Sequence, residues 1–111
     1  SPWLAVDLGE GRGLIATAYS IMHGSGSSSN AMRSWRFEGS NNKNSWITLR
    51  EHLNDPRMQT PGQVETFFLH NLDKEVTRLQ AFRYFRILLT GPNSSNFFRL
   101  CACRLELYGR Y

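Results

Sequence analysis

The sequence predicts an all-β fold, an antiparallel β-sandwich or jelly roll, because three of its features agree. Seven short segments alternate apolar and polar residues with a period of two, which is typical of strands with one buried face. Turn-forming Gly, Pro, Asn and Ser residues separate these segments. No long segment has a convincing helical periodicity, and the connections are too short for parallel crossovers. A βαβ enzyme is therefore excluded.

The first two expected strands lie on either side of a glycine-rich turn. Residues 4–8 alternate, with Leu4 and Val6 on one side and Asp7 on the other, and residues 14–22 alternate again. We expect these two segments to pair as a hairpin. The glycine spacing between them is also found in phosphate-binding loops, but such a loop must open a helix. Since the alternation resumes directly, we expect no nucleotide site.

Two tryptophan-containing segments, residues 34–40 and 45–50, form the clearest hairpin. Trp35 and Phe37 share one face of the first segment, and charged residues occupy the other face. The connection at residues 41–44 consists of Asn and Lys, which tolerate the left-handed backbone of a tight turn. We therefore expect a hairpin with one buried face and one solvated face.

The second half of the chain contains three more expected strands. They are residues 64–69, 82–89 and 100–108, of which 82–89 has the strongest alternation of large apolar residues. Turn signals with proline interrupt residues 52–63 and forbid a continuous strand there. Residues 71–80 carry scattered charges around a few apolar residues, so they form either one helical turn or an ordered loop.

Length, charge and cysteine content limit the class of protein. The 111 residues fit one domain, 1–111. The net charge is +4, but the 13 basic residues are dispersed, so we expect no nucleic-acid partner. No apolar run reaches the roughly 20 residues of a membrane helix, so no transmembrane segment is expected. Cys101 and Cys103 lie on one side of one strand and offer too few metal ligands, so we expect reduced, packed thiols and a reducing compartment.

The aromatic and basic residues of the strands have expected structural roles. Trp3, Trp35 and Trp46 fall at apolar positions, so we expect all three to pack in the core rather than to stack on a carbohydrate. Arg83 and Arg86 are expected to pair with acidic residues across the sheet.

Three irregular segments are expected to meet at one end of the sandwich. Successive antiparallel strands reverse direction, so alternate connections share an end, and these are residues 23–33, 52–63 and 90–99. Their Arg, Asn and aromatic side chains combine planar hydrogen bonding with stacking area, which is typical of recognition surfaces. The candidate ligand- or partner-binding residues are His23, Asn30, Arg33, His52, Asn54, Asp55, Arg57, Asn93, Asn96, Phe97 and Phe98. The last two are adjacent and point apart, so one of them is expected to be exposed.

The order of these motifs resembles the discoidin family, also called the coagulation factor type C domain. The motifs that carry the resemblance are Trp3-Leu4-Ala5-Val6-Asp7-Leu8-Gly9, Tyr19-Ser20-Ile21, Ser34-Trp35-Arg36-Phe37-Glu38-Gly39-Ser40, Trp46, Arg83-Tyr84-Phe85-Arg86-Ile87 and Leu105-Glu106-Leu107-Tyr108-Gly109. Residues 52–55 and 89–92 are similar to segments of the intracellular members attached to BTB-domain proteins and ubiquitin-ligase components. The resemblance implies a galactose-binding-like sandwich whose rim binds sugars, phospholipid headgroups or protein segments.

Two departures from the family pattern refine this expectation. Secreted discoidin domains are usually closed by a disulfide that joins their two ends, and no cysteine lies near Ser1. This favours the intracellular branch, in the cytoplasm or the nucleus. Family domains also usually begin before the Trp3 motif, so an N-terminal strand and a loop of the rim are expected to be missing from this sequence.

These observations favour a non-catalytic binding module of a larger, ubiquitin-ligase-related protein. We expect a protein partner, with a carbohydrate or a phospholipid headgroup as the alternative and no cofactor. The Ser- and Gly-rich segment 23–33 lacks large apolar tips, which disfavours membrane insertion. No motif supports catalysis or a metal, although the shared location of His23, His52 and Asp55 leaves an acid–base or metal site open. The oligomeric state is not determined by these patterns.

Overall fold

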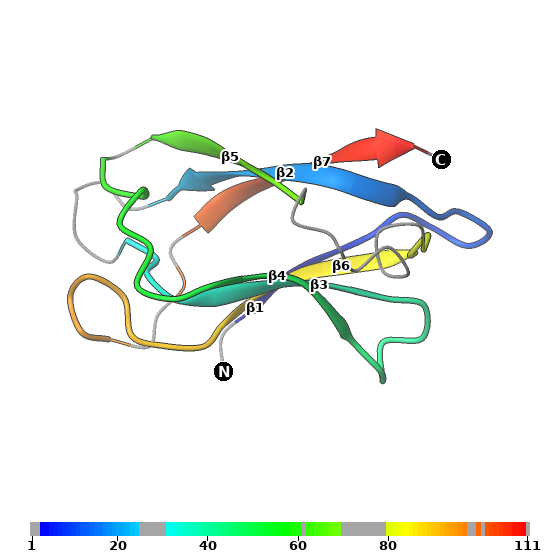
Figure 1. Ribbon diagram of the computed structural model, residues 1–111, viewed down its shortest axis with the longest axis horizontal. Coiled ribbons are helices and arrows are strands. Elements are labelled where there is room, and N and C mark those ends of the chain that lie inside the picture. The colour runs from blue at the N-terminus through cyan, green and yellow to red at the C-terminus, as the bar shows by residue number, and fades with distance from the viewer. Residues whose placement is uncertain are drawn as a thin grey trace.

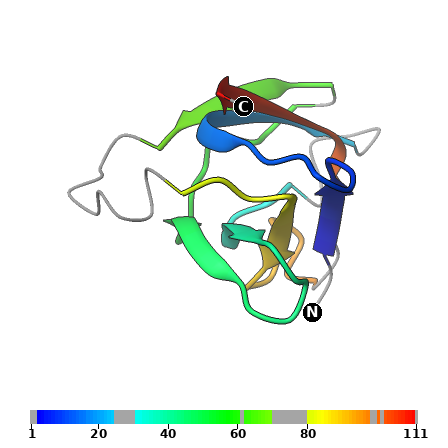
Figure 2. The ribbon, with the colours of Figure 1, turned by 90° about the vertical axis from the view of Figure 1, so that its right-hand side faces the viewer.

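Seven strands form the framework of the part of the chain that the structure describes. The computed structural model describes residues 3–24, 31–60, 62–69, 80–97, 100 and 102–110. The strands are β1 (Trp3–Asp7), β2 (Ile15–His23), β3 (Trp35–Ser40), β4 (Ile47–His52), β5 (Val64–Phe68), β6 (Tyr84–Leu89) and β7 (Ala102–Arg110). They form a four-stranded sheet of order β1-β6-β3-β4 and a three-stranded sheet of order β5-β2-β7, both antiparallel. The two sheets pack face to face (Figures 1 and 2), which confirms the predicted all-β sandwich.

The hairpin predicted between the first two strands is wrong. β1 pairs with β6, whereas β2 pairs with β5 and β7 in the other sheet. The intervening turn uses Gly9 and Gly11 at φ values of 107° and 77°, which favour glycine. A single bridge between Leu14 and Phe82 then connects this turn region to the chain before β6. Alternation specifies which face of a strand is buried, but it does not specify the sheet to which the strand belongs.

The hairpin predicted between the two tryptophan-containing segments is confirmed. β3 and β4 pair from Trp35 opposite His52 to Gly39 opposite Ile47, with an irregular register after Phe37. The turn is closed by the Ser40 hydroxyl oxygen, which accepts hydrogen bonds from the backbone N–H groups of Asn42 and Lys43. Lys43 adopts a φ of 65° in this turn, as the Asn-rich sequence predicted.

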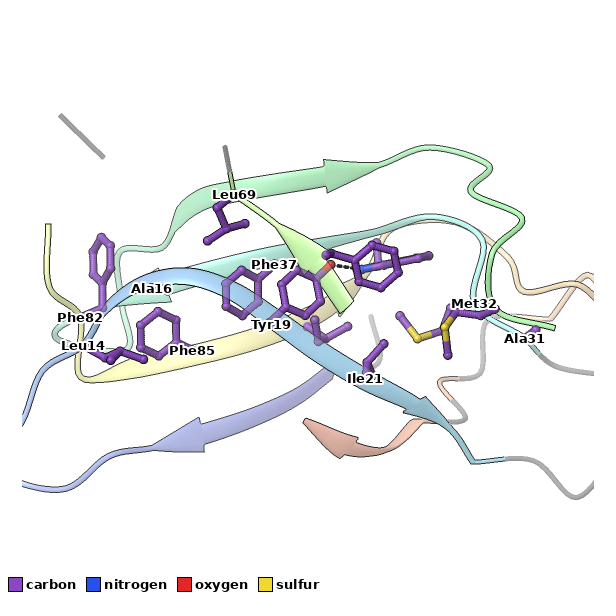
Figure 3. Close-up of a cluster of buried hydrophobic side chains, with 14 residues drawn as sticks. Leu14, Ala16, Tyr19, Ile21, Ala31, Met32, Phe37, Leu69, Phe82 and Phe85 are labelled. Carbon is purple, nitrogen blue, oxygen red and sulfur yellow. Dashed lines mark hydrogen bonds between the residues drawn. The ribbon is translucent and has the colours of Figure 1, made fainter. Parts of the chain in front are cut away.

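Aromatic rings dominate the core between the sheets. Tyr19 of β2 stacks on Phe37 of β3 with ring centroids 4.1 Å apart, and Phe37 stacks on Phe85 of β6 at 5.6 Å (Figure 3). All three side chains are fully buried, as the alternation predicted. Gly39 leaves room for a neighbouring ring, because a Cβ there would lie 2.6 Å from Phe82. Burial of each large apolar side chain contributes roughly 1.5–3 kcal/mol to stability.

The prediction for the tryptophans is confirmed for one residue and wrong for two. Trp35 is fully buried, but Trp3 is 60% exposed and Trp46 is partly exposed. Trp3 shares its strand face with Ala5 and Asp7, which points away from the core. Trp46 precedes β4 and belongs to the turn region rather than to the strand. Both indoles therefore lie on the outer face of the four-stranded sheet.

The ion pairs predicted for Arg83 and Arg86 are confirmed. Arg83 Nε donates to Asp7 Oδ1 at 2.7 Å, and Arg86 Nε donates to Glu38 Oε1 at 2.6 Å. Glu38 is buried, although the sequence predicted that it lies on the solvated face of its strand.

Several expectations lie outside the described residues. They concern Cys101, the side chain of Cys103 and the segment at residues 71–79. Within the described residues, no helix has the length and apolarity that a membrane span requires.

Candidate functional site

The first two of the three irregular segments meet at one end of the sandwich, as the strand directions predicted (Figure 1). The backbone N–H of Asp55 donates to the carbonyl oxygen of Arg33 at 2.6 Å. The backbone N–H of His23 likewise donates to the carbonyl oxygen of Gln63 at 2.9 Å. The β2–β3 and β4–β5 connections are therefore joined through their main chains. We call the described residues of the three segments at this end the rim.

The third segment is joined to the first by equally direct contacts. The Thr90 N–H donates to the carbonyl oxygen of Ser34 at 3.0 Å. Ser94 and Ala31 exchange two hydrogen bonds, from Ser94 N–H to the Ala31 carbonyl at 2.8 Å and from Ala31 N–H to the Ser94 hydroxyl at 2.9 Å. Gly91 packs closely on this junction, because a Cβ there would lie 3.0 Å from the Ser34 Cβ. All three connections thus form one hydrogen-bonded unit.

A chain of hydrogen bonds runs from the core to the rim. Trp35 Nε1–H donates to the Tyr19 hydroxyl oxygen at 2.8 Å, and that hydroxyl lies 2.6 Å from His52 Nε2. His52 Nδ1 lies 2.9 Å from Asp55 Oδ2. An indole can only donate and an ionised carboxylate can only accept. The Tyr19 hydroxyl therefore donates to Nε2, and the proton of a neutral His52 lies on Nδ1.

Burial and hydrogen bonding set the protonation states along this chain. Burial lowers the pKa of His52 to about 4, although the hydrogen bond to Asp55 opposes the shift. Burial alone would raise the pKa of Asp55, but the hydrogen bonds from Arg57 and His52 outweigh it and lower the pKa to about 2. Burial also raises the pKa of Tyr19 above its ordinary value. At neutral pH the chain thus joins a neutral phenol, a neutral imidazole and a carboxylate.

This arrangement positions the rim rather than offering reactive groups. Both ring nitrogens of His52 are engaged and its side chain is 2% exposed, while Tyr19 is fully buried. His23 is buried as well. A general base must reach the proton that it removes from a substrate, and none of these three side chains is accessible. Among the described residues, no group of three or more His, Cys, Asp or Glu side chains is placed to hold a metal ion.

The two rim arginines are held by internal partners. The Arg57 guanidinium donates to both oxygens of the Asp55 carboxylate, at 3.3 and 3.1 Å, and lies 4.3 Å from the Phe67 ring centroid. Arg33 donates through one nitrogen to the carbonyl oxygen of Met58 at 2.7 Å. Arg57 nevertheless keeps 42% of its side chain exposed. Both arginines therefore brace the rim, and Arg57 also contributes to its surface.

Two apolar side chains form the exposed tips of the rim. Phe97 is 64% exposed and Leu53 is 70% exposed. Each adjoins an exposed asparagine with a left-handed backbone, Asn96 at φ 65° and Asn54 at φ 52°. Sequence reasoning missed Leu53, because a single apolar residue next to a turn also occurs in buried positions. The Asn54 that follows it is the only local signal of an exposed tip.

The side-chain amides of Asn93 and Gln63 hold the backbone of the loops in place, and sequence reasoning missed Gln63. Asn93, which was predicted to bind a ligand, is 4% exposed, and its Oδ1 accepts from the N–H groups of Ser95 and Phe97 at 2.9 and 3.0 Å. Gln63, which sequence reasoning did not single out, accepts from the Gln59 N–H at 2.7 Å through Oε1. Its Nε2 donates to the Arg57 carbonyl oxygen at 2.6 Å. No pattern in the sequence distinguishes these amides from solvated ones.

The structure divides the sequence-predicted rim residues by accessibility. The exposed ones are Asn54, Arg57, Asn96 and Phe97, the half-buried ones Arg33 and Asp55, the buried ones His23, His52 and Asn93, and those outside the described residues Asn30 and Phe98. The surface that a partner could touch is therefore smaller than the predicted set and includes Leu53.

Three known proteins with similar sequences are much longer than this chain. No protein-family model matches it. The chain is 35% identical over its whole length to a BTB/POZ domain-containing protein of Arabidopsis thaliana, of which it spans 13%. It is 32% identical over 97% of its length to the E3 ubiquitin-protein ligase Ufd4 of Drosophila melanogaster, and 34% identical over 86% to the E3 ubiquitin-protein ligase hecd-1 of Caenorhabditis elegans. The chain spans 4% of each of these two ligases.

The fold also occurs in a solved structure. CBM62 of Clostridium thermocellum Xyl5A superposes with a TM-score of 0.68 at 24% identity, over 97% of this chain and 68% of that one. This similarity bears on the fold alone. With the two antiparallel sheets described above, it confirms the predicted fold, a galactose-binding-like β-sandwich.

Proposed function

We propose that this domain is a non-catalytic, discoidin-like module that recognises a protein segment at its rim. The larger protein that contains it is related to ubiquitin ligases and works in the cytoplasm or the nucleus. The similarity to one BTB protein and two E3 ligases supports this context. The order of the discoidin motifs along the chain supports the family assignment.

The exposed apolar tips on a braced rim carry the proposal. Leu53 and Phe97 are the two largely exposed apolar side chains among the described rim residues. Their loops are joined through Ser34, which accepts from the Thr90 N–H through its carbonyl and from the Asn54 N–H through its hydroxyl. Pre-organised loops lose little conformational entropy on binding. The same rim carries the partly exposed Arg57, and apolar anchors together with arginine are typical of protein interfaces.

The described arginines of the rim already have partners within the domain, which favours a protein partner over an anionic headgroup. A phosphate needs cationic donors that are free to bind it. On the described rim, Arg57 is paired with Asp55 and Arg33 donates to main-chain carbonyls. A phospholipid headgroup would have to displace these contacts. An apolar protein side chain can dock on the rim without disturbing them.

Affinity capture from a cytosolic extract, followed by a binding measurement with the recovered protein, tests the proposal. The rim variant Leu53→Ser/Phe97→Ser is compared with the matched variant Val64→Ser/Phe68→Ser. The control residues are also exposed, at 48% and 58%, but lie on β5. We expect the unmodified domain and the β5 variant to retain the same protein and the rim variant to lose it.

Parallel assays with a glycan array and with vesicles that contain anionic phospholipids cover the alternative ligands. Binding to a glycan or to vesicles that is abolished by the rim substitutions, without any captured protein, would replace the protein-binding proposal. Equal capture by both double variants would remove the rim as the binding surface.

A further inference from the structure

A second candidate binding site lies on the outer face of the four-stranded sheet, away from the rim. It is a groove of 360 Å³ between β1, β6 and the β3–β4 turn. Its lining includes Trp3, Ala5 and Asp7 of β1, Tyr84 and Arg86 of β6, and Lys43 and Trp46 of the turn region. The β3–β4 turn lies at the end of the sandwich opposite the rim (Figure 1). We call this feature the outer groove.

The register of β1 on β6 creates the depth of the groove. Trp3 pairs with Leu88, Ala5 with Arg86 and Asp7 with Tyr84. Side chains at every second position of a strand point to the same face, so Ala5 is flanked on this face by a large indole and a carboxylate. Its methyl group leaves a depression between them. The volume lies at the lower end of the range for ligand sites, which suits one or two side chains.

The wall of the groove opposite Trp3 is held in place by several contacts. The Trp46 indole N–H donates to the Lys43 carbonyl oxygen at 3.1 Å. The Arg86 guanidinium carbon lies 4.0 Å from the Trp46 ring centroid, while Arg86 Nε donates to Glu38. The Lys43 ammonium lies 5.2 Å from the Tyr84 ring centroid. Cations thus already occupy aromatic faces of this wall, which disfavours a cationic ligand.

The charges of the groove favour an anionic ligand. Asp7 is neutralised by Arg83, and Arg86 is neutralised by Glu38. Among the residues that the structure describes, no carboxylate lies within ion-pair distance of the Lys43 ammonium. Once the two pairs cancel, the positive charge of Lys43 remains. The hydrogen bond from the Lys43 backbone N–H to Ser40 holds the main chain of this residue in the β3–β4 turn, and its side chain lines the groove.

The position of β1 indicates the kind of ligand. Among the described residues, β1 is one of the two edge strands of its sheet, and an edge strand can pair with the main chain of an extended peptide. A peptide aligned with β1 would direct alternate side chains toward the outer groove. Trp3, at 60% exposure, offers apolar area to one of them. We propose that the outer groove binds an extended acidic peptide, with an apolar side chain against Trp3 and Ala5 and a neighbouring carboxylate at Lys43.

Titration followed by nuclear magnetic resonance tests this proposal with three blocked tetrapeptides. They are Ac-Thr-Phe-Glu-Thr-NH2 and the versions with Gln or Lys in place of Glu. We expect saturable shifts of the Trp3 and Trp46 indole N–H signals. The signal of Trp35, which is buried and bonded to Tyr19, should not move and also reports on the fold. The Glu peptide should bind roughly two- to fivefold more tightly than the Gln peptide, as one exposed ion pair allows, and the Lys peptide most weakly.

Charge-matched variants separate the groove from the rest of the surface. Lys43→Gln should abolish the preference for Glu over Gln, whereas Arg104→Gln, on the exposed face of β7, should retain it. Leu53→Ser/Phe97→Ser should bind all three peptides unchanged, so this test is independent of the rim proposal. The proposal fails if no signal saturates up to about 10 mM peptide, a concentration that reveals even millimolar affinity. A Lys peptide that binds as tightly as the Glu peptide, a Glu preference that survives Lys43→Gln, or binding lost in the rim variant would also overturn it.

Discussion

Replacing Tyr19 with phenylalanine tests whether the buried hydrogen-bond chain stabilises the fold. The substitution removes one oxygen atom and keeps the ring that stacks on Phe37. The lost hydroxyl accepts from Trp35 Nε1–H at 2.8 Å and donates to His52 Nε2 at 2.6 Å. Trp35 and Tyr19 are fully buried and His52 is 3% exposed. Water therefore has little access to the groups that lose their partner.

The expected cost follows from the two groups left without a hydrogen bond. Each buried donor or acceptor that loses its partner costs about 1–3 kcal/mol. The Trp35 N–H and His52 Nε2 together imply a loss of about 3 kcal/mol in the free energy of unfolding. Domains of this kind are stable by about 5–15 kcal/mol. The variant should thus remain folded but lose a substantial part of its stability.

Urea unfolding followed by tryptophan fluorescence and circular dichroism measures this loss. Tyr108→Phe is the control, because its hydroxyl also makes two hydrogen bonds but the residue is 43% exposed. Water can replace those bonds, so we expect a loss below about 1 kcal/mol for the control. If Tyr19→Phe costs no more than Tyr108→Phe, the inferred role of the buried chain is wrong.

Two further predictions concern titration and a buried ion pair. Because the pKa of His52 is about 4 in the folded protein and 6.5 ordinarily, the unfolded state binds its proton first as the pH falls. The free energy of unfolding should thus decline by about 3 kcal/mol between pH 6.5 and 4. The pKa of Asp55 is about 2 in the folded protein and 3.8 ordinarily, so its protonation should add a second decline below pH 4. Urea midpoints across this range check both steps, and a His52→Gln variant that kept the first decline would contradict its assignment. Arg86→Gln should lower the free energy of unfolding by about 3 kcal/mol, because it leaves the Glu38 side chain, which is 5% exposed, without its partner. Arg36→Gln breaks a pair with Glu51 whose side chains are 43% and 42% exposed, so it should cost under about 1 kcal/mol. Equal losses in urea unfolding would refute this difference.

The alternation of residues predicted the strands and most of their buried faces correctly. Phe37 and Phe85 are in the core where the period of two placed them. Strand reversal also predicted which connections meet at the rim. The same reasoning could not assign β1 and β2 to sheets, because each strand buries one face whether it pairs with the other or lies across the core from it.

Accessibility within the rim could not be predicted from local sequence. His52 stands at the end of a strand, where a histidine is usually solvated, yet it stacks on Trp35 at 4.1 Å and bonds to Tyr19. Its burial depends on partners that are distant in the sequence. The same holds for Asn93, whose side chain holds a turn together instead of facing a ligand.

The sequence by itself determined the fold class, the strand faces and the end of the sandwich where the loops meet. These properties follow from periodicity and from the direction of successive strands, which are local features of the chain. Only the tertiary structure decided which rim side chains are exposed and that Trp3 and Trp46 line an outer groove. Such properties depend on contacts between strands that are far apart in sequence, and the free energies of these contacts are not encoded in any single segment.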